Sequence, residues 1–166
     1  PEHRPTLEMH VRMLVDVLAG LHMVHTLKDA KRQAAGLFHG ELGPAHVLVG
    51  LDGVVKLVFV ARPRPVKDPK RSPCVGYLAP EVLLEDASAD ARADLYGVGV
   101  MLWEAITGRR LHEARSGGQI LSQQLSGRVD PPRIPEDRPW AAPLADVAMR
   151  ALATDPLARY ASAGQM

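Results

Sequence analysis

The sequence predicts a mainly α-helical fold with one small β-hairpin. Two long stretches predict helices. In residues 7–27 apolar side chains recur every three or four positions, and residues 91–107 are apolar on nearly every face of a helix. Two short valine-rich runs on either side of Asp52-Gly53 carry the hairpin prediction, since Asp-Gly is a strong signal for a tight turn between strands.

The first helix is expected to begin after Thr6, whose hydroxyl can cap it. Its apolar face is formed by residues at helical spacing: Leu7, Val11, Leu14, Val15, Leu18 and Leu21. The polar run 28–33 then predicts a loop.

The strands of the hairpin are expected at Val47–Val49 and Val54–Val60. After them, prolines and charged residues from Arg62 to Pro73 break every period, which predicts an exposed loop over about residues 62–75.

A helix that is apolar all round should lie at the centre of the fold, so residues 91–107 are expected to be buried. Gly108 directly after them suits a helix C-terminus. Further helices are predicted at Gln119–Leu125 and Leu144–Thr154, separated by the proline-rich connection 131–143.

Composition restricts the classes of function. Lys and Arg number 20 against 19 Asp and Glu, so no global basic field favours nucleic acid or an anionic membrane. No stretch is long and apolar enough to cross a bilayer, and the single Cys74 excludes an intramolecular disulfide framework. We therefore expect one cytoplasmic domain over residues 1–166, with neither nucleic acid nor a membrane as partner.

Five sequence motifs, in order, resemble the C-terminal lobe of bacterial Ser/Thr protein kinases. They are Val17–His22, His39–Val49 (HGELGPAHVLV), Gly76–Glu81, Ala93–Gly99, and Asp155-Pro156 with Arg159-Tyr160. The resemblance covers about residues 6–164 and implies a protein-kinase-like C-lobe. Since the sequence starts where the first long helix of that lobe starts, the N-terminal lobe is expected to be absent.

The catalytic loop of such kinases has the pattern H-R-D-L-K-P-x-N, in which Asp, Lys and Asn serve as proton acceptor, phosphate neutraliser and magnesium ligand. By resemblance, Glu41, Gly43 and His46 stand at these three positions here, and Phe59 stands at the magnesium-binding Asp of the D-F-G triplet. The resemblance thus implies a pseudokinase, not an enzyme, without a nucleotide or metal cofactor.

Residues on which the kinase fold depends are present, by contrast. The resemblance implies that Glu81 pairs with Arg159, that Asp94 accepts backbone N–H bonds from the catalytic loop, and that His39 packs beneath this loop. These four residues are expected to be structural.

The resulting hypothesis is a catalytically inactive module that binds another protein or a second copy of itself. The expected interface is the hairpin face that an N-lobe normally covers, with Leu48, Val58, Phe59 and Val60. The alternative is a fragment of a working Ser/Thr protein kinase whose ATP-binding N-lobe is missing or supplied by another chain.

Several residues carry a second interpretation. Glu41 is a carboxylate and so a candidate weak general base, and Ser72 before Pro73 is a candidate phosphosite. Cys74, beside Lys70 and Arg71, is either a reactive thiol or, as we expect, a plain surface-loop cysteine.

Two binding alternatives remain. The histidines that would form a metal cluster lack neighbouring thiolates, so core and loop roles are expected for them: His22, His25, His39 and His46. The basic run 62–71 lacks aromatic residues for base stacking, so a solvated loop is expected instead of a nucleic-acid contact.

Overall fold

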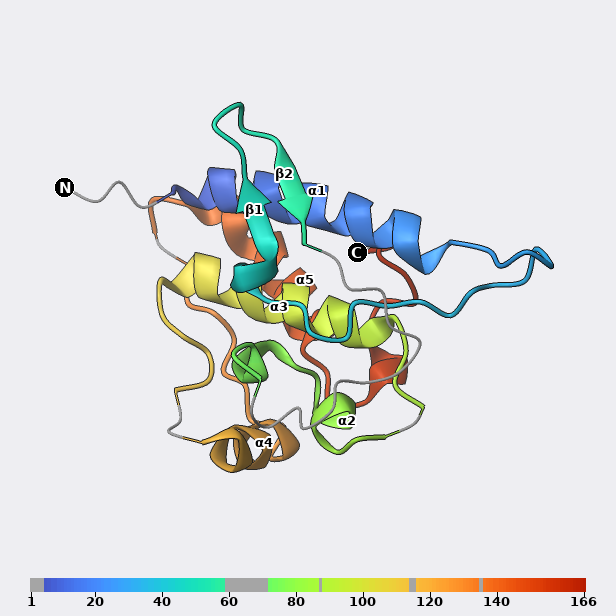
Figure 1. Cartoon of the computed structure of the whole chain (residues 1–166). Helices are drawn as coiled ribbons and strands as arrows, with labels where there is room; N and C mark the ends of the chain where they lie inside the picture. Colours follow the sequence, from blue (N-terminus) through green and yellow to red (C-terminus); the bar gives the residue numbers. More distant parts are fainter. Residues whose placement is uncertain (1–4, 59–71, 87, 114–115, 135) are drawn as a thin grey trace.

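The computed structural model describes residues 5–58, 72–86, 88–113, 116–134 and 136–166 (Figure 1). The described elements are helices with a single two-stranded antiparallel sheet, so the predicted fold class is confirmed. This architecture is consistent with a kinase C-lobe.

Helix α1 (Leu7–His25) begins where the sequence predicts, because the Thr6 side chain accepts a hydrogen bond from the backbone N–H of Met9 (3.3 Å). It ends two residues earlier than predicted. Thr26 terminates it by donating its hydroxyl to the carbonyl of His22 (2.7 Å), which satisfies one of the last helical acceptors.

Strands β1 (Val47–Val49) and β2 (Val55–Leu57) form the hairpin, with Leu48 opposite Lys56. The second strand is predicted over Val54–Val60. Val54 belongs instead to the turn, where its N–H donates to the Asp52 carboxylate (3.1 Å), and Val58 follows the strand, while residues 59 and 60 lie outside the described residues. Gly53 in this turn has φ 78°, a conformation that glycine adopts without strain.

Helix α3 (Arg92–Thr107) occupies the centre of the core, as its apolar sequence predicts. It packs against α1 and against α5 (Ala142–Ala151), and the hairpin lies over α1 (Figure 1). The α3–α5 contact depends on a glycine, because a Cβ at Gly99 would lie 2.7 Å from that of Ala151. Gly108 ends α3 at φ 67°, the position expected for it.

Two short helices complete the lobe. Helix α2 (Pro80–Leu83) is not predicted by the periodicity, and α4 (Gly117–Leu125) starts two residues before its predicted beginning because Ser116 caps it. Helix α5 likewise starts and ends earlier than predicted. Single-turn 3-10 segments lie at Pro44–His46, Val75–Tyr77, Pro139–Ala141 and Pro156–Ala158. Among the described helices, none combines the length and the hydropathy needed to cross a membrane.

Candidate functional site

A buried carboxylate on α3 organises the loop that the sequence analysis singles out. Asp94 is 2% exposed, and its Oδ1 accepts the N–H of Gly40 while Oδ2 accepts the N–H of His39, both at 2.8 Å. The imidazole Nε2 of His25 lies 2.8 Å from the same Oδ2. The ring of His39 is itself buried, with Nε2 2.9 Å from the carbonyl of Val58, so this loop is fixed to both α3 and the hairpin.

Glu81 and Arg159 form a second buried network. Arg159 donates Nη1 to Oε1 of Glu81 (2.6 Å) and Nη2 to Oε2 (2.8 Å), a bidentate ion pair. Its remaining N–H groups donate to the carbonyls of Ala153, Arg92 and Thr154 at 2.8–3.2 Å. Both side chains are buried, and this pair joins α2 to the end of the chain.

Glu41 lies against the segment that precedes Val75–Tyr77. The hydroxyl of Ser72 donates to Oε1 of Glu41 (2.5 Å) and accepts the N–H of Cys74 (3.0 Å). Ser72 is buried. Another kinase could therefore phosphorylate its hydroxyl only after the segment with Ser72 moved away from Glu41.

Gly43 has no room for a side chain. A Cβ at this position would lie 2.8 Å from Sγ of Cys74, a separation that real Cβ atoms essentially never show, and 3.2 Å from the ring of Tyr77, which is tighter than most Cβ contacts. The same sulfur lies 3.6 Å from Nδ1 of His46. The side chain of Cys74 thus occupies the space that a side chain at position 43 would need.

The placement of Cys74 differs from the expected surface position, because it is 1% exposed. Burial raises the pKa of its thiol, and the neighbouring Glu41 carboxylate raises it further. A protonated thiol without solvent contact is a poor nucleophile. The local sequence, with Lys70 and Arg71 nearby, carries no signal for this burial.

The outer hairpin face consists of side chains that alternate away from α1. Leu48 and Val58 are 54% and 42% exposed, and Val54 and Leu51 extend the exposed apolar surface toward the turn. Phe59 and Val60, also expected at this interface, lie outside the described residues, as does most of the predicted loop 62–75.

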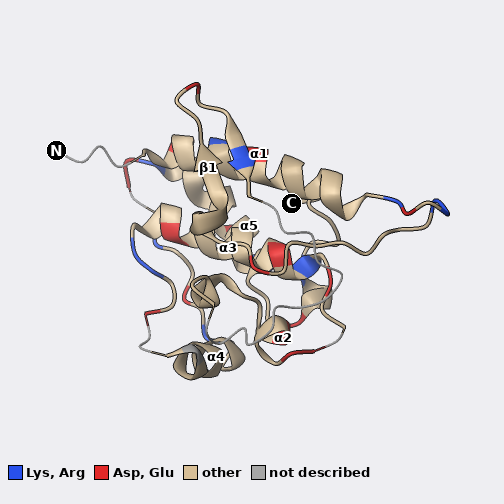
Figure 2. Ribbon diagram, viewed as in Figure 1, with Lys and Arg blue, Asp and Glu red and all other residues tan. Residues whose placement is uncertain are grey.

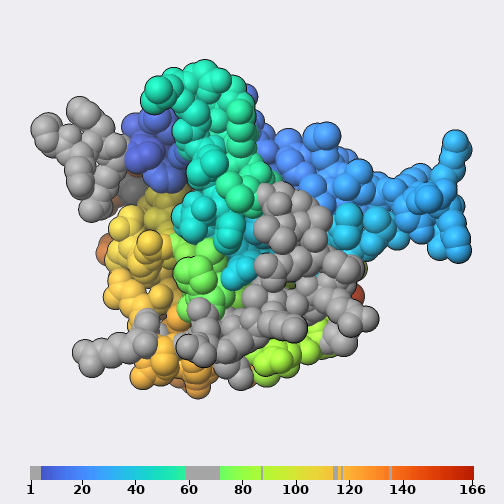
Figure 3. All heavy atoms as spheres, in the orientation of Figure 1, coloured from blue at the N-terminus to red at the C-terminus, as the bar shows by residue number. Residues whose placement is uncertain are grey.

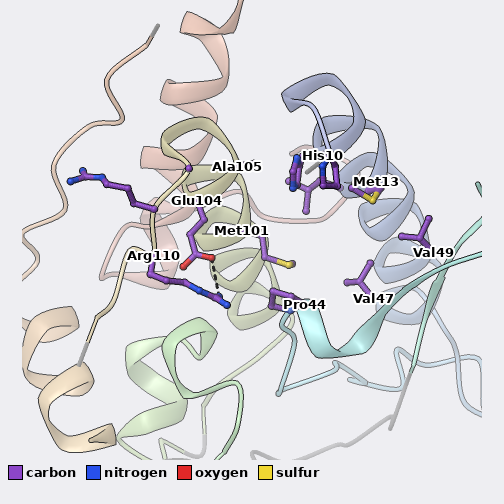
Figure 4. Close-up of a pocket in the computed structure, with 13 residues that line it drawn as sticks. His10, Met13, Pro44, Val47, Val49, Met101, Glu104, Ala105 and Arg110 are labelled. Atoms are coloured by element: carbon purple, nitrogen blue, oxygen red, sulfur yellow. Dashed lines mark hydrogen bonds and ion pairs between the residues drawn. The ribbon is translucent and has the colours of Figure 1, made fainter. Parts of the chain in front are cut away.

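A groove of about 680 Å³ lies beside the hairpin, between α1, β1 and the C-terminal half of α3 (Figure 4). Its apolar lining comes from all three elements, including Met13, Val47, Val49 and Met101. The sequence analysis did not identify this groove, because its walls come from positions far apart in the chain.

Glu104 marks the polar end of the groove. Its carboxylate accepts hydrogen bonds from the Tyr77 hydroxyl (2.8 Å), from Nη1 of Arg110 (3.2 Å; Figure 4) and from the N–H of Leu111 (3.1 Å). Burial raises the pKa of Glu104 to about 7, and the hydrogen bond from the N–H of Leu111 acts in the opposite direction without cancelling this effect.

The histidines that the metal hypothesis groups together occupy different environments. His25 contacts Asp94, whereas the rings of His39 and His46 meet edge to face at 4.9 Å. Within the described ranges, no group of His, Cys, Asp and Glu side chains has an arrangement that could hold a metal ion.

Comparison with curated proteins identifies relatives that are protein kinases. The chain is 32% identical to the serine/threonine-protein kinase PknL of Mycobacterium tuberculosis over 160 residues, 92% of this chain and 37% of the relative. It is 31% identical to PknB of the same species over 140 residues, 79% and 22% of the two chains.

A third relative is a tyrosine kinase. Tyrosine-protein kinase MasK of Myxococcus xanthus is 28% identical over 172 aligned residues, 97% of this chain and 26% of the relative. No family model matches the chain. The chain spans between 22% and 37% of the length of these three relatives. Over most of its length, it is a distant homologue of bacterial Ser/Thr and Tyr protein kinases.

Proposed function

We propose that this chain is a pseudokinase module, which does not transfer phosphate and acts by binding another protein. The observation that carries the first half of the proposal is the packing at Gly43. Its side-chain space is filled by Cys74, at the position where kinase resemblance places the phosphate-neutralising lysine.

Phosphoryl transfer depends on positioning and on neutralising the charge of the phosphate, with little covalent work for the protein to do. A glycine supplies no cation. A lysine at position 43 would clash with the sulfur of Cys74. Such overpacking lowers the free energy of unfolding, so a cation cannot be added here without destabilising the fold.

The two neighbouring positions support the same conclusion. Glu41, at the proton-acceptor position, already accepts the Ser72 hydroxyl, so that oxygen faces the protein's own segment. His46, at a magnesium-ligand position, offers an imidazole where magnesium prefers oxygen. At residue 59 the sequence has Phe in place of a carboxylate.

The binding half of the proposal depends on the outer hairpin face. Leu48, Val58, Val54 and Leu51 expose apolar surface on one small element, around the exposed Lys56 that lies opposite Leu48. Exposed apolar side chains gathered on one element are typical of interaction sites in many proteins. The partner is another protein or a second copy of this chain, and Phe59 and Val60 continue the same run in the sequence.

Nucleotide titration tests the catalytic half. A ligand that binds the native state raises its stability by RT ln(1 + [L]/Kd), so millimolar ATP with magnesium should leave the melting temperature unchanged. Radiolabelled phosphate should reach neither the chain nor a generic substrate, with an intact relative such as PknB as positive control.

A reverted variant makes this test sharper. The combination Glu41→Asp, Gly43→Lys and His46→Asn restores the kinase residues at these three positions, while Gly40 and Phe59 remain. We expect this variant to melt at a lower temperature and to remain inactive. A magnesium-dependent thermal shift of several degrees, or phosphate transfer by the unaltered chain, would instead support the kinase-fragment alternative.

The binding half is tested with Leu48→Asp, and Leu157→Asp serves as a control for an exposed apolar residue away from the hairpin (76% exposed). Light scattering measures self-association, and capture on the immobilised chain measures binding of other proteins. Leu48→Asp should weaken one of the two and Leu157→Asp neither. If both variants behave like the unaltered chain, the hairpin face is not the interface.

A further inference from the structure

A projecting segment between α1 and His39 exposes three cations and one acidic residue. We call residues 26–37 the basic arm. Its ribbon leaves the end of α1, extends well beyond the rest of the molecule and then returns to it (Figure 1), and Figure 3 shows the atoms at its outer end standing clear of the body. Figure 2 places Lys and Arg at its outer end.

The base of the basic arm is fixed by one carboxylate. Oδ2 of Asp94 contacts Nε2 of His25, directly before the arm, and the N–H of His39, just after it, both at 2.8 Å. Phe38 beside them is buried. The arm therefore starts and ends at the same rigid point of the core.

The tip of the arm is also ordered by hydrogen bonds. The backbone of Asp29 forms two hydrogen bonds. Its N–H donates to the carbonyl of Gln33 (2.8 Å), and its carbonyl accepts the N–H of Arg32 (2.9 Å). Its carboxylate accepts the N–H groups of Lys31 (2.8 Å) and Gln33 (2.9 Å). The only acidic group of the arm thus stabilises the turn.

The cations of the arm are directed to solvent. Lys28, Lys31 and Arg32 are exposed, and none of them forms an ion pair within the part of the chain that the structure describes. Because the whole chain carries a formal charge of only +1, this concentration is a local property.

Arg32 occupies a costly backbone position. Its φ of 62° lies in the left-handed region, where a side chain other than Gly or Asn is disfavoured. Glycine would fit this turn better, and nothing in the core contacts the exposed arginine. A strained residue that the fold does not need is a reason to look for a function of its side chain.

We propose that the basic arm binds an acidic segment of a partner protein through Lys28, Lys31 and Arg32. Three cations on a rigid turn complement a short run of carboxylates, and such complementarity guides association and orientation. The arm has no aromatic side chain on which a nucleic-acid base could stack, which favours a protein partner. This surface is separate from the outer hairpin face, so the inference does not depend on the proposed function.

The test uses a fluorescein-labelled oligoglutamate peptide of about ten residues, with oligoglutamine as the neutral comparison. Fluorescence anisotropy at about 20 mM salt measures the affinity of the full chain, where screening is weak. The variant Lys28→Gln/Lys31→Gln/Arg32→Gly should bind oligoglutamate at least about 5-fold more weakly. Its melting temperature should be equal or higher, because the glycine relieves the left-handed position.

A matched variant removes the same charge elsewhere. Arg12→Gln/Arg128→Gln/Arg133→Gln alters three exposed arginines outside the arm, and its affinity for oligoglutamate should stay within about 2-fold of the unaltered chain. Equal weakening by both triple variants would mean that net charge alone attracts the peptide, which overturns the proposal. Arm-dependent binding of single-stranded DNA or of phosphatidylserine vesicles that is tighter than that of oligoglutamate would overturn the choice of partner.

Discussion

Around Arg159, every N–H of a buried guanidinium meets an acceptor, whereas around Gly43 the space for a side chain is filled by Cys74. The first region is sensitive to removal, because truncation leaves a buried charge without its partner. The second is sensitive to addition, because any Cβ overlaps a packed sulfur. Loss of charge and addition of volume therefore probe the two regions separately.

The largest expected effect tests the first region. Arg159→Ala should lower the free energy of unfolding by about 3–5 kcal/mol, because the Glu81 carboxylate stays buried without its partner. Urea denaturation measures the change. The exposed Arg133→Ala should alter stability by less than about 0.5 kcal/mol. A loss at residue 159 as small as at residue 133 would remove the contrast between the two regions.

The next largest effect tests the second region. Gly43→Ala should cost about 1–3 kcal/mol of unfolding free energy, because its Cβ meets Sγ of Cys74. The cost should shrink in a Cys74→Ala background, where the sulfur is gone, and a double-mutant cycle by urea denaturation measures this coupling. At Gly118, in α4, a Cβ meets nothing within 4 Å, so Gly118→Ala should be neutral or stabilising. Equal costs at positions 43 and 118 would contradict the packing argument.

A third prediction concerns the carboxylate at the edge of the groove. The folded pKa of Glu104 is raised from its ordinary value of 4.5 to about 7, so the folded protein binds this proton more tightly than the unfolded chain. The contribution of Glu104 to stability is therefore present below about pH 4.5 and is lost as the pH rises toward 7.

Glu104→Gln provides the comparison for this pH dependence. The difference in unfolding free energy between the unaltered chain and this variant should fall from pH 4.5 to 7 and then become constant. The lowered pKa of His112 gives an opposite slope in part of this range, but it is common to both proteins and cancels in the difference. A difference independent of pH would show that Glu104 titrates normally.

The smallest effect is expected on the outer hairpin face. Leu48→Asp should change the free energy of unfolding by less than about 1 kcal/mol, since the side chain is exposed and an aspartate would lie opposite Lys56. Thermal and urea denaturation check this. A large loss would place Leu48 in the core contacts of the hairpin and make it unsuitable for testing an interface.

The helices and the hairpin could be predicted because their signals are local. The apolar spacing of α1, the apolar run of α3 and the Asp52-Gly53 turn each lie within a short window of sequence. Helix α2 escaped prediction because four residues are too few to show a period. The starts of α4 and β2 were misplaced because a side-chain cap and a turn contact, which periodicity does not report, set them.

The contacts of the candidate site could be predicted only in part. The Glu81–Arg159 pair followed from resemblance to kinases, since no local pattern links residues 78 positions apart. The contacts of Glu41 with Ser72 and of Gly43 with Cys74 carry no sequence signal, because each joins a loop to a segment about thirty positions later. They arise from tertiary packing, as does the burial of Cys74.

Asp94 has a consequence for how the chain tolerates changes in length. His25 and His39 both contact Oδ2 of Asp94, so the two ends of the basic arm are held together whatever its length. Residues added at the tip would therefore leave these core contacts in place. The entropic cost of closing a flexible loop rises by only about 0.6 kcal/mol when its length doubles. The tip of the basic arm is therefore a suitable place to insert an epitope or a small folded reporter. Natural insertions should also be tolerated there more readily than within the helices of the core.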